Sequence, residues 1–309
     1  GFSSQVDKLW STIRRDLQMT GYFKIIDPDA YIDQSGGVAP NTFNFSDWTL
    51  LQAAALAKTS LKSVDSMLEV DLYVYDVNQG TPILGKRLKA NNSSVTAIAH
   101  KVSAHIVRAL TGQETFLGQS LVVVGEKTGN KEIYIMGLDG TSHRAVTKNG
   151  SINLSPAWSP SGEQIAWTSY KRRNPDLFVK NLKTGKVRSL SSIQGLNIGA
   201  AYSANGKWVA LTRSERGDSD IFIIDANTGN TIKRITTGGG IDVSPSFSPD
   251  GTQLAFASER SGGSQIFVYN LSSGETRRVS RQGSFNVDPV WSPDGTKLAF
   301  VGRDPNFDV

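Results

Sequence analysis

Histidine and cysteine are the side chains most often recruited for chemistry at neutral pH, and this chain has three histidines and no cysteine. The lack of cysteine excludes disulfide bonds, zinc thiolate sites and thiol nucleophiles. His100 and His105 stand five residues apart in a helical pattern, whereas zinc ligands on one helix share a face at a spacing of three or four. We interpret both, together with His143, as solvated or packing residues. The sequence therefore predicts no catalytic residue, no metal site and no cofactor.

Serine hydrolysis and nucleic-acid binding are also disfavoured. A hydrolase of the α/β type needs a Gly-x-Ser-x-Gly elbow, and no such pentapeptide occurs in the chain. The 33 basic and 28 acidic residues give a net charge of +5, and the basic residues are scattered in short pairs such as Arg172-Arg173 and Arg277-Arg278. Scattered charge of this kind predicts solvated strands rather than a nucleic-acid surface. A repeated Asp-Gly pair lacks the dense carboxylates of a calcium loop and predicts a turn.

The most informative feature is an internal repeat within residues 116–309. A large aromatic residue recurs every 44 or 45 residues, in segments of the type Pro-x-Trp-Ser-Pro-Asp-Gly or close variants of it, at Trp158, Tyr202, Phe247 and Trp291. This period, with four strands in each unit, is typical of the blades of a β-propeller. One large residue in each unit, always before the same turn, predicts packing between adjacent blades rather than a surface for stacking sugars or bases.

The repeat is incomplete at both ends. The opening segment, from Leu121 to Thr147, supplies strands without the aromatic residue, and the chain ends at Asp308-Val309, which align with the third strand of a blade. We therefore expect four blades and part of a fifth. Because an open propeller would expose unpaired strand edges, we also expect the native protein to carry further blades.

Residues 1–115 predict a small α/β domain in front of the propeller. Apolar residues at helical spacing predict helices over residues 6–17 and 95–110, the second of which ends at Gly112. A shorter helix is expected from residue 46 or 47 through the stretch 53–57. Strands are predicted over residues 22–27, 68–75 and 81–88. The predicted fold is thus an α+β multidomain protein, with an N-terminal α/β domain (1–115) and an antiparallel β-propeller (116–309).

The blade repeat and the preceding domain together resemble the TolB family, a periplasmic component of the Tol–Pal system of Gram-negative bacteria. The resemblance covers nearly the whole chain. In the first domain it rests on Asp16-Leu17, on Gly21-Tyr-Phe23 and on the strand Leu72-Tyr-Val-Tyr-Asp76. It implies a six-bladed propeller without catalytic activity, a location in the periplasm, and a role in outer-membrane integrity and cell division.

The same resemblance implies protein partners. Members of the family bind the lipoprotein Pal at one mouth of the propeller channel, and they contact TolA through an extreme N-terminal segment. We expect that segment to be missing here, because the chain begins inside the first helix. Other outer-membrane proteins are further expected partners, whereas nucleic acid and direct membrane insertion are not expected.

The expected partner-binding residues lie in the loops that precede the innermost strands, at residues 149–155, 194–200, 239–244 and 283–288. In propellers of this kind these loops gather around one channel mouth. The residues assigned to the Pal-binding mouth are Asn153, Leu196, Asn197, Asp242, Val243, Asn286 and Asp288.

Two other function classes stay open. The repeat also occurs in propellers of prolyl-oligopeptidase-type serine peptidases, whose hydrolase domain would have to lie outside this chain. A carbohydrate-binding or small-molecule-binding propeller, with or without lyase activity, would need clustered His, Arg and Tyr residues at the channel. Three histidines in the whole chain disfavour that second class.

Overall fold

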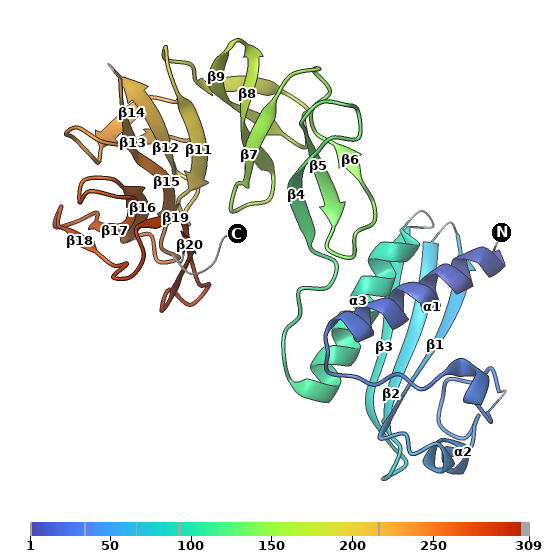
Figure 1. The fold of residues 1–309 in the computed structure, drawn as a ribbon. Coiled ribbons are helices and arrows are strands. Elements are labelled where there is room, and N and C mark those ends of the chain that lie inside the picture. The colour runs from blue at the N-terminus through green and yellow to red at the C-terminus, as the bar shows by residue number, and fades with distance from the viewer. Residues whose placement is uncertain (1, 34, 66, 92–93, 216, 304–309) are drawn as a thin grey trace. The chain divides into compact units, whose positions relative to one another are not determined.

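The computed structural model describes residues 2–33, 35–65, 67–91, 94–215 and 217–303, drawn in Figure 1. The chain divides into two compact units. The first comprises Gly1–Leu121 with Gly137–Thr141, and the second comprises Val122–Met136 with Ser142–Val309. The boundary expected after residue 115 stays a prediction, and each unit is described by itself.

The first unit packs two helices on one face of a three-stranded antiparallel sheet (Figure 1). The helices are α1 (Phe2–Met19) and α3 (Val95–Thr111), and the sheet has the order β1 (Ala55–Val64), β2 (Met67–Asp76), β3 (Thr81–Asn91). Alternate residues of β2 point to the helices, because successive side chains of a strand face opposite ways. The core consists of these residues and the apolar stripes of both helices, Leu9, Ile13, Leu17, Leu68, Val70, Leu72, Val74, Val95, Ile98, Ala99, Val102, Ile106 and Val107. The predicted helices 6–17 and 95–110 are confirmed.

Aromatic residues cover one end of the opposite face of this sheet. A short helix, α2 (Phe45–Leu50), and a 3-10 turn, η1 (Pro28–Ala30), bring Trp48 and Tyr31 into edge-to-face contact at 4.9 Å. Tyr75 of β2 is fully buried among these rings, and its hydroxyl donates a hydrogen bond to the carbonyl of Val38. This second cluster fixes the loop between α1 and β1 on the sheet.

Two predictions in this unit are wrong. The stretch 53–57 is not helical, because α2 ends at Leu50, Gln52 is left-handed with φ 57°, and Ala55 opens β1. Pairing of all ten residues of β1 with β2 outweighs the helix preference of alanine. Residues 22–27 do not form a strand, since Phe23 and Ile25 pack against the helical core and Ile26 packs against the aromatic cluster without a partner strand in the described chain.

The second unit consists of antiparallel sheets that follow one another along the chain. Among the described residues, three sheets have four strands, and they are flanked by one sheet of three and one of two strands. The strands are β4 (Ser120–Gly125), β5 (Glu132–Gly137) and β6 (Arg144–Ala145); β7 (Asn153–Trp158), β8 (Gln164–Arg172), β9 (Asn174–Asn181) and β10 (Val187–Ser191); β11 (Asn197–Tyr202), β12 (Trp208–Glu215), β13 (Asp218–Asp225) and β14 (Thr231–Arg234); β15 (Asp242–Phe247), β16 (Gln253–Ser258), β17 (Gln265–Asn270) and β18 (Thr276–Arg278); β19 (Phe285–Trp291) and β20 (Leu298–Arg303). The strand expected at Asp308-Val309 lies outside the described residues.

Adjacent sheets pack face to face through apolar side chains. Separate clusters join the sheet β4–β6 to β7–β10, the sheet β7–β10 to β11–β14, and the sheet β11–β14 to β15–β18. The recurring aromatic residues lie in these layers. Trp158, Tyr202 and Phe247 pack in successive clusters, and the indole Nε1 of Trp291 donates to the carbonyl of Ser246 in the preceding sheet at 3.1 Å. Their predicted role in packing between blades is confirmed.

The Ser-Pro-Asp-Gly turns also form as predicted. The first turn has serine in place of aspartate (Ser159-Pro160-Ser161-Gly162), and Gly162 closes it with φ 68°, a conformation that glycine adopts without strain. The second blade lacks both prolines, yet Gly206 has φ 69° and the hydroxyl of Ser203 donates to Asn205 Oδ1 at 2.8 Å. The glycine and the side-chain hydrogen bond therefore preserve this turn without proline.

Candidate functional site

The four innermost strands, β7, β11, β15 and β19, all start at one edge of the second unit, which we call the leading edge. Neighbouring members of this set contact each other. A polar residue stands at the same position near the start of each strand, opposite the end of the second strand of its sheet. We call these four the hub residues, Asn153, Asn197, Asp242 and Asn286. Their side chains are buried, with exposed fractions of 0%, 0%, 6% and 3%.

Asn153 joins its own sheet to the preceding one. Its Nδ2 lies 3.0 Å from both the carbonyl of Lys131 and Oε2 of Glu132, the first residue of the neighbouring β5. Its Oδ1 accepts from Ser169 Oγ at 2.7 Å and from Trp167 Nε1 at 3.2 Å within its own sheet. Because the side chain is buried, these hydrogen bonds hold the loop 149–153 in one conformation.

The other two asparagines repeat this arrangement. Asn197 Nδ2 donates to the carbonyl of Ile193 at 2.7 Å in its own loop, and lies 3.2 Å from the carbonyl of Pro175 in the preceding sheet. Asn286 Nδ2 donates to Gln282 O at 2.9 Å and to Oε1 of Gln265 at 3.0 Å. An amide suits this position because one group supplies both donors and an acceptor.

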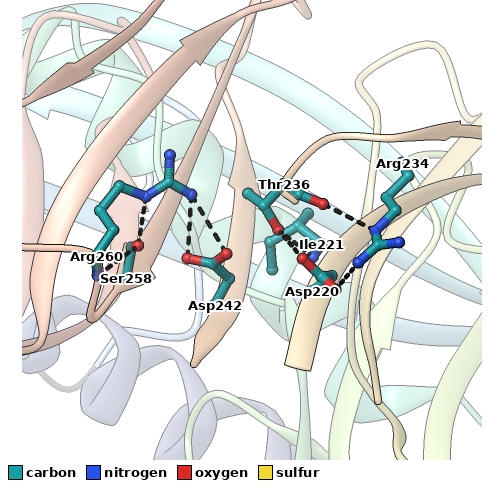
Figure 2. A network of polar contacts seen from close by, with 7 residues as sticks. All are labelled: Asp220, Ile221, Arg234, Thr236, Asp242, Ser258 and Arg260. Atoms are coloured by element: carbon teal, nitrogen blue, oxygen red, sulfur yellow. Dashed lines mark hydrogen bonds and ion pairs between the residues drawn. The ribbon is translucent and has the colours of Figure 1, made fainter. Parts of the chain in front are cut away.

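Asp242 is the exception, and Figure 2 shows how its junction differs. The neighbouring sheet presents Asp220 at the position that Glu132 and Gln265 occupy elsewhere. Carboxylate oxygens accept hydrogen bonds and do not donate them, so the two side chains do not bond each other and each accepts from its own arginine. Asp242 accepts from Arg260 Nη2 at 3.2 and 3.3 Å, and Asp220 accepts from Arg234 Nη2 at 2.5 Å and from Thr236 Oγ1 at 3.1 Å.

An apolar residue directly precedes each hub residue, and these four form what we call the apolar row, Ile152, Leu196, Ile241 and Phe285. Ile152, Ile241 and Phe285 are 48%, 48% and 45% exposed, and Leu196 is half-buried. The backbone carbonyls of Ile152, Leu196 and Ile241 accept hydrogen bonds of 2.9 to 3.2 Å from backbone N–H groups near or just after the end of the second strand. The hub residues and these backbone bonds thus hold large apolar side chains in solvent at the leading edge.

The predicted partner-binding residues divide into two groups. The side chains of the four hub residues are buried and shape the loops from within. Leu196 and Val243 are half-buried, and Asp288 is exposed and accepts a 2.5 Å hydrogen bond from Ser244 Oγ of the neighbouring strand. Ile152, Ile241 and Phe285 were not among the residues predicted from the sequence. Aligning the repeats would have found them, since each stands immediately before a hub residue.

Exposed apolar side chains are the main feature of this surface. In the part of the chain that the structure describes, no three His, Asp or Glu side chains gather as metal ligands. His100 lies in the first unit, where its Nδ1 is 2.8 Å from Oδ2 of the buried Asp16, so its interpretation as a packing residue agrees with its contacts. Exposed apolar side chains on a fixed framework are the usual centre of a protein interface. No described helix is long and apolar enough to cross a membrane.

Comparison with known proteins gives the same domain order. Residues 3–83 match the family model described as TolB amino-terminal domain, and residues 107–309 match that of the TolB beta propeller domain. A TolB homolog of Chlorobium luteolum is 35% identical over 169 residues, and a Tol-Pal system protein TolB of Syntrophotalea carbinolica is 36% identical over 160 residues. These alignments cover 55% and 51% of this chain, but only 38% and 37% of the relatives, so the match spans less than half of their length.

A solved structure extends the similarity to almost the whole chain. The crystal structure of TolB from Acinetobacter baumannii superimposes with a TM-score of 0.87 at 30% identity, covering 97% of this chain and 75% of that one. The fold of both units therefore agrees with the fold of that protein. Since the propeller model alone matches more than half of the residues, this chain belongs to the TolB family.

Proposed function

We propose that this protein is a non-catalytic periplasmic scaffold of the Tol–Pal system that binds Pal at the leading edge of its propeller. The observation that carries the proposal is the apolar row. Large side chains are kept in solvent there by buried polar hubs, whereas isolated apolar residues on an ordinary surface have no such framework. The residues assigned are Asn153, Leu196, Asn197, Asp242, Val243, Asn286 and Asp288, with Ile152, Ile241 and Phe285 added.

The proposed roles within this set follow from burial. Side chains of the apolar row, together with Asp288, would contact the partner directly. The hub residues would act through the conformation of their loops. Outer-membrane integrity and cell division are the cellular processes that such a scaffold would support, and TolA and other outer-membrane proteins are its further proposed partners.

The sharpest test compares two isoleucines of equal exposure. Ile241 lies in the apolar row and Ile232 lies on the outermost strand β14, and both are 48% exposed. We expect Ile241→Glu to weaken binding of the organism's own Pal domain at least tenfold, since a carboxylate would be desolvated in the interface. Ile232→Glu should leave the affinity unchanged. Isothermal titration calorimetry measures both, after thermal unfolding has shown that both variants are folded.

Equal affinity of the two variants would place the Pal site elsewhere. Asp242 is a poor probe for this purpose, because replacing a buried, paired carboxylate would disturb folding as well as binding. A separate assay addresses catalysis: we expect no turnover of peptide or ester substrates by the pure protein. Turnover that one substitution in this chain abolishes would contradict the scaffold proposal.

A further inference from the structure

The leading edge carries an excess of exposed cations next to the apolar row. The loops that join the second strand to the third strand of each sheet return to this same edge, because the strands are antiparallel. Exposed basic side chains occupy these loops or the strand ends beside them. We call this set the basic rim, Lys127, Lys131, Lys171, Arg172, Arg173, Arg260 and Arg303.

Fewer exposed acids accompany the basic rim. Among the described residues of these loops and strand ends, the exposed carboxylates are Glu126, Glu259 and Asp218 at the start of β13, and Lys131 Nζ lies 3.8 Å from Glu126 Oε1. The carboxylates of Asp220 and Asp242 are buried below the surface and already accept hydrogen bonds from arginines. What a partner would meet at this edge is therefore a surface with exposed positive charge and interspersed acids.

Arg260 is a cation of the basic rim whose guanidinium makes several contacts within its own sheet. Its Nε donates to Ser258 Oγ at 2.7 Å and its Nη2 faces both oxygens of Asp242. Its guanidinium carbon lies 5.3 Å from the ring centre of Phe256 and 5.2 Å from that of Phe267. The side chain still has a 34% exposed fraction. Figure 2 shows the guanidinium extending beyond Asp242, with one terminal nitrogen free of drawn bonds.

Such an arginine binds an anion with little loss of conformational freedom. A flexible arginine loses rotamer entropy when it pairs with a carboxylate, whereas the rotamer of Arg260 is already fixed by its contacts. Ordered arginines beside apolar residues are the side chains that most often dominate interface energy. Lys171 has a similar setting, since its Nζ lies 3.9 Å from the ring centre of Phe178.

We propose that the basic rim docks an acidic surface of the protein partner, with Arg260 as its anchor. This inference rests on the proposed function and adds the chemistry of the partner: carboxylates facing the basic rim and apolar side chains facing the apolar row. The combination favours a protein over a membrane or a nucleic acid. Interspersed acids such as Glu259 would repel a continuous layer of phosphates, but can pair with discrete cations of a protein.

The substitution of Asp242 used in the test follows the other blades, which have asparagine at the hub position. Asp242→Asn/Arg260→Gln removes the anchor and the buried carboxylate together, so that no unpaired charge stays in the core. We expect this double variant to bind the Pal domain at least tenfold more weakly than wild type. Asp242→Asn alone changes the hub but keeps the arginine, so it should weaken binding less than the double variant does. Arg277→Gln, on the exposed outermost strand β18, is the matched control and should bind normally.

A second variant avoids the hub altogether. Lys171→Gln/Arg172→Gln/Arg173→Gln changes only exposed residues of the loop region between β8 and β9, and should also weaken binding at least tenfold. The affinity of wild type should fall as NaCl rises from about 50 to about 300 mM, because salt screens exposed charges. The salt dependence should be smaller for both multiple variants.

The possible results separate the two proposals. Equal Pal binding by wild type and both multiple variants would overturn the acidic-partner inference and leave the proposed function standing. No Pal binding by wild type would overturn both. Wild-type binding to phosphatidylglycerol vesicles that the double variant loses, with Pal binding unchanged, would assign the basic rim to lipid and would also overturn the inference.

Discussion

At the scale of single residues, the hub asparagines explain why the leading edge keeps its shape. Each is buried, and each bonds both its own loop and the preceding sheet. A buried polar group is favourable only when its partners are present, so removing one leaves several others unsatisfied. Substitution of a hub residue should therefore lower the free energy of unfolding by more than the size of its side chain suggests.

Replacing Asn153 tests this directly. Asn153→Ala would leave Glu132 Oε2 and Trp167 Nε1 without this partner in the core, and we expect the free energy of unfolding to fall by about 2–4 kcal/mol. Asn227→Ala, in an exposed turn, should change it by less than about 0.5 kcal/mol. Urea denaturation followed by fluorescence measures both. A loss below about 1 kcal/mol for Asn153→Ala would mean that the hub contributes little to stability.

A second residue-scale prediction concerns Asp33 and Lys58 in the first unit. Burial alone would raise the pKa of Asp33, but hydrogen bonds from Lys58 and Ser35 and the charge of Lys58 lower it from 3.8 to about 2. A carboxylate with a lowered folded pKa stabilises the protein above its unfolded pKa. This stabilisation is lost as the pH falls from about 5 to about 2.

The loss due to this pair should be about 2 kcal/mol across that window. Asp33→Asn removes the titrating group, so its free energy of unfolding should fall less steeply with decreasing pH than that of wild type. Lys58→Met should also make the dependence shallower, because it removes the cation. Denaturant titrations at a series of pH values between 2 and 5 measure the difference; parallel curves for wild type and Asp33→Asn would refute this account.

At the scale of elements, each innermost strand contains a bulge just after its hub residue. The pairing register shifts there in β7, β11, β15 and β19. The first of the two residues in each bulge is left-handed, with φ 50° at Ser155, 68° at Gly199, 56° at Ser244 and 51° at Asp288. A bulge bends a strand and redirects its side chains, which fits its repeated use at the leading edge.

Gly199 shows what the left-handed conformation costs. A Cβ atom at this position would meet no heavy atom within 4 Å, so Gly199→Ala introduces backbone strain without a clash. We expect it to lower the free energy of unfolding by about 1 kcal/mol. Gly239→Ala is the control, because it also points into open space but does not have a positive φ. Equal stability of the two variants, in the same denaturant assay, would show that the bulge adopts another conformation.

At the scale of the whole molecule, the two units have separate apolar cores. One core lies between helices and sheet in the first unit, and three clusters lie between the sheets of the second. Residues 112–119 connect α3 to β4 without regular helix or strand. A domain with its own core can fold independently, so each unit should unfold as a separate transition.

Cleavage at Glu114 tests this organisation and the boundary expected after residue 115. The side chain of Glu114 is 79% exposed, so a Glu-specific protease should cut there early. We expect both fragments to keep cooperative thermal transitions in circular dichroism. Glu114→Gln should block cleavage at this site. Loss of structure in either fragment after the cut would mean that the two units depend on each other for folding.

The sequence by itself determined the local and periodic features. Local sequence is enough to predict the apolar stripe of α3, its end at Gly112 and the Ser-Pro-Asp-Gly turns, because each depends on neighbours within a few residues. The blades are predictable because the same sequence motif recurs in each of them. The polar hub positions were recognisable for the same reason. The TolB resemblance follows from this repetition together with the domain in front of it.

Tertiary structure alone decided which side of the surface each of those residues occupies. Ala55 is in a strand because it pairs with β2. The side chain of Asn153 is buried, where it donates a hydrogen bond to Glu132, 21 residues away. Likewise, Asp242 and Arg260 pair across 18 residues, and Ile241 is left in solvent. Burial is a property of the space between segments distant in sequence, so no local pattern separates a buried asparagine from an exposed one.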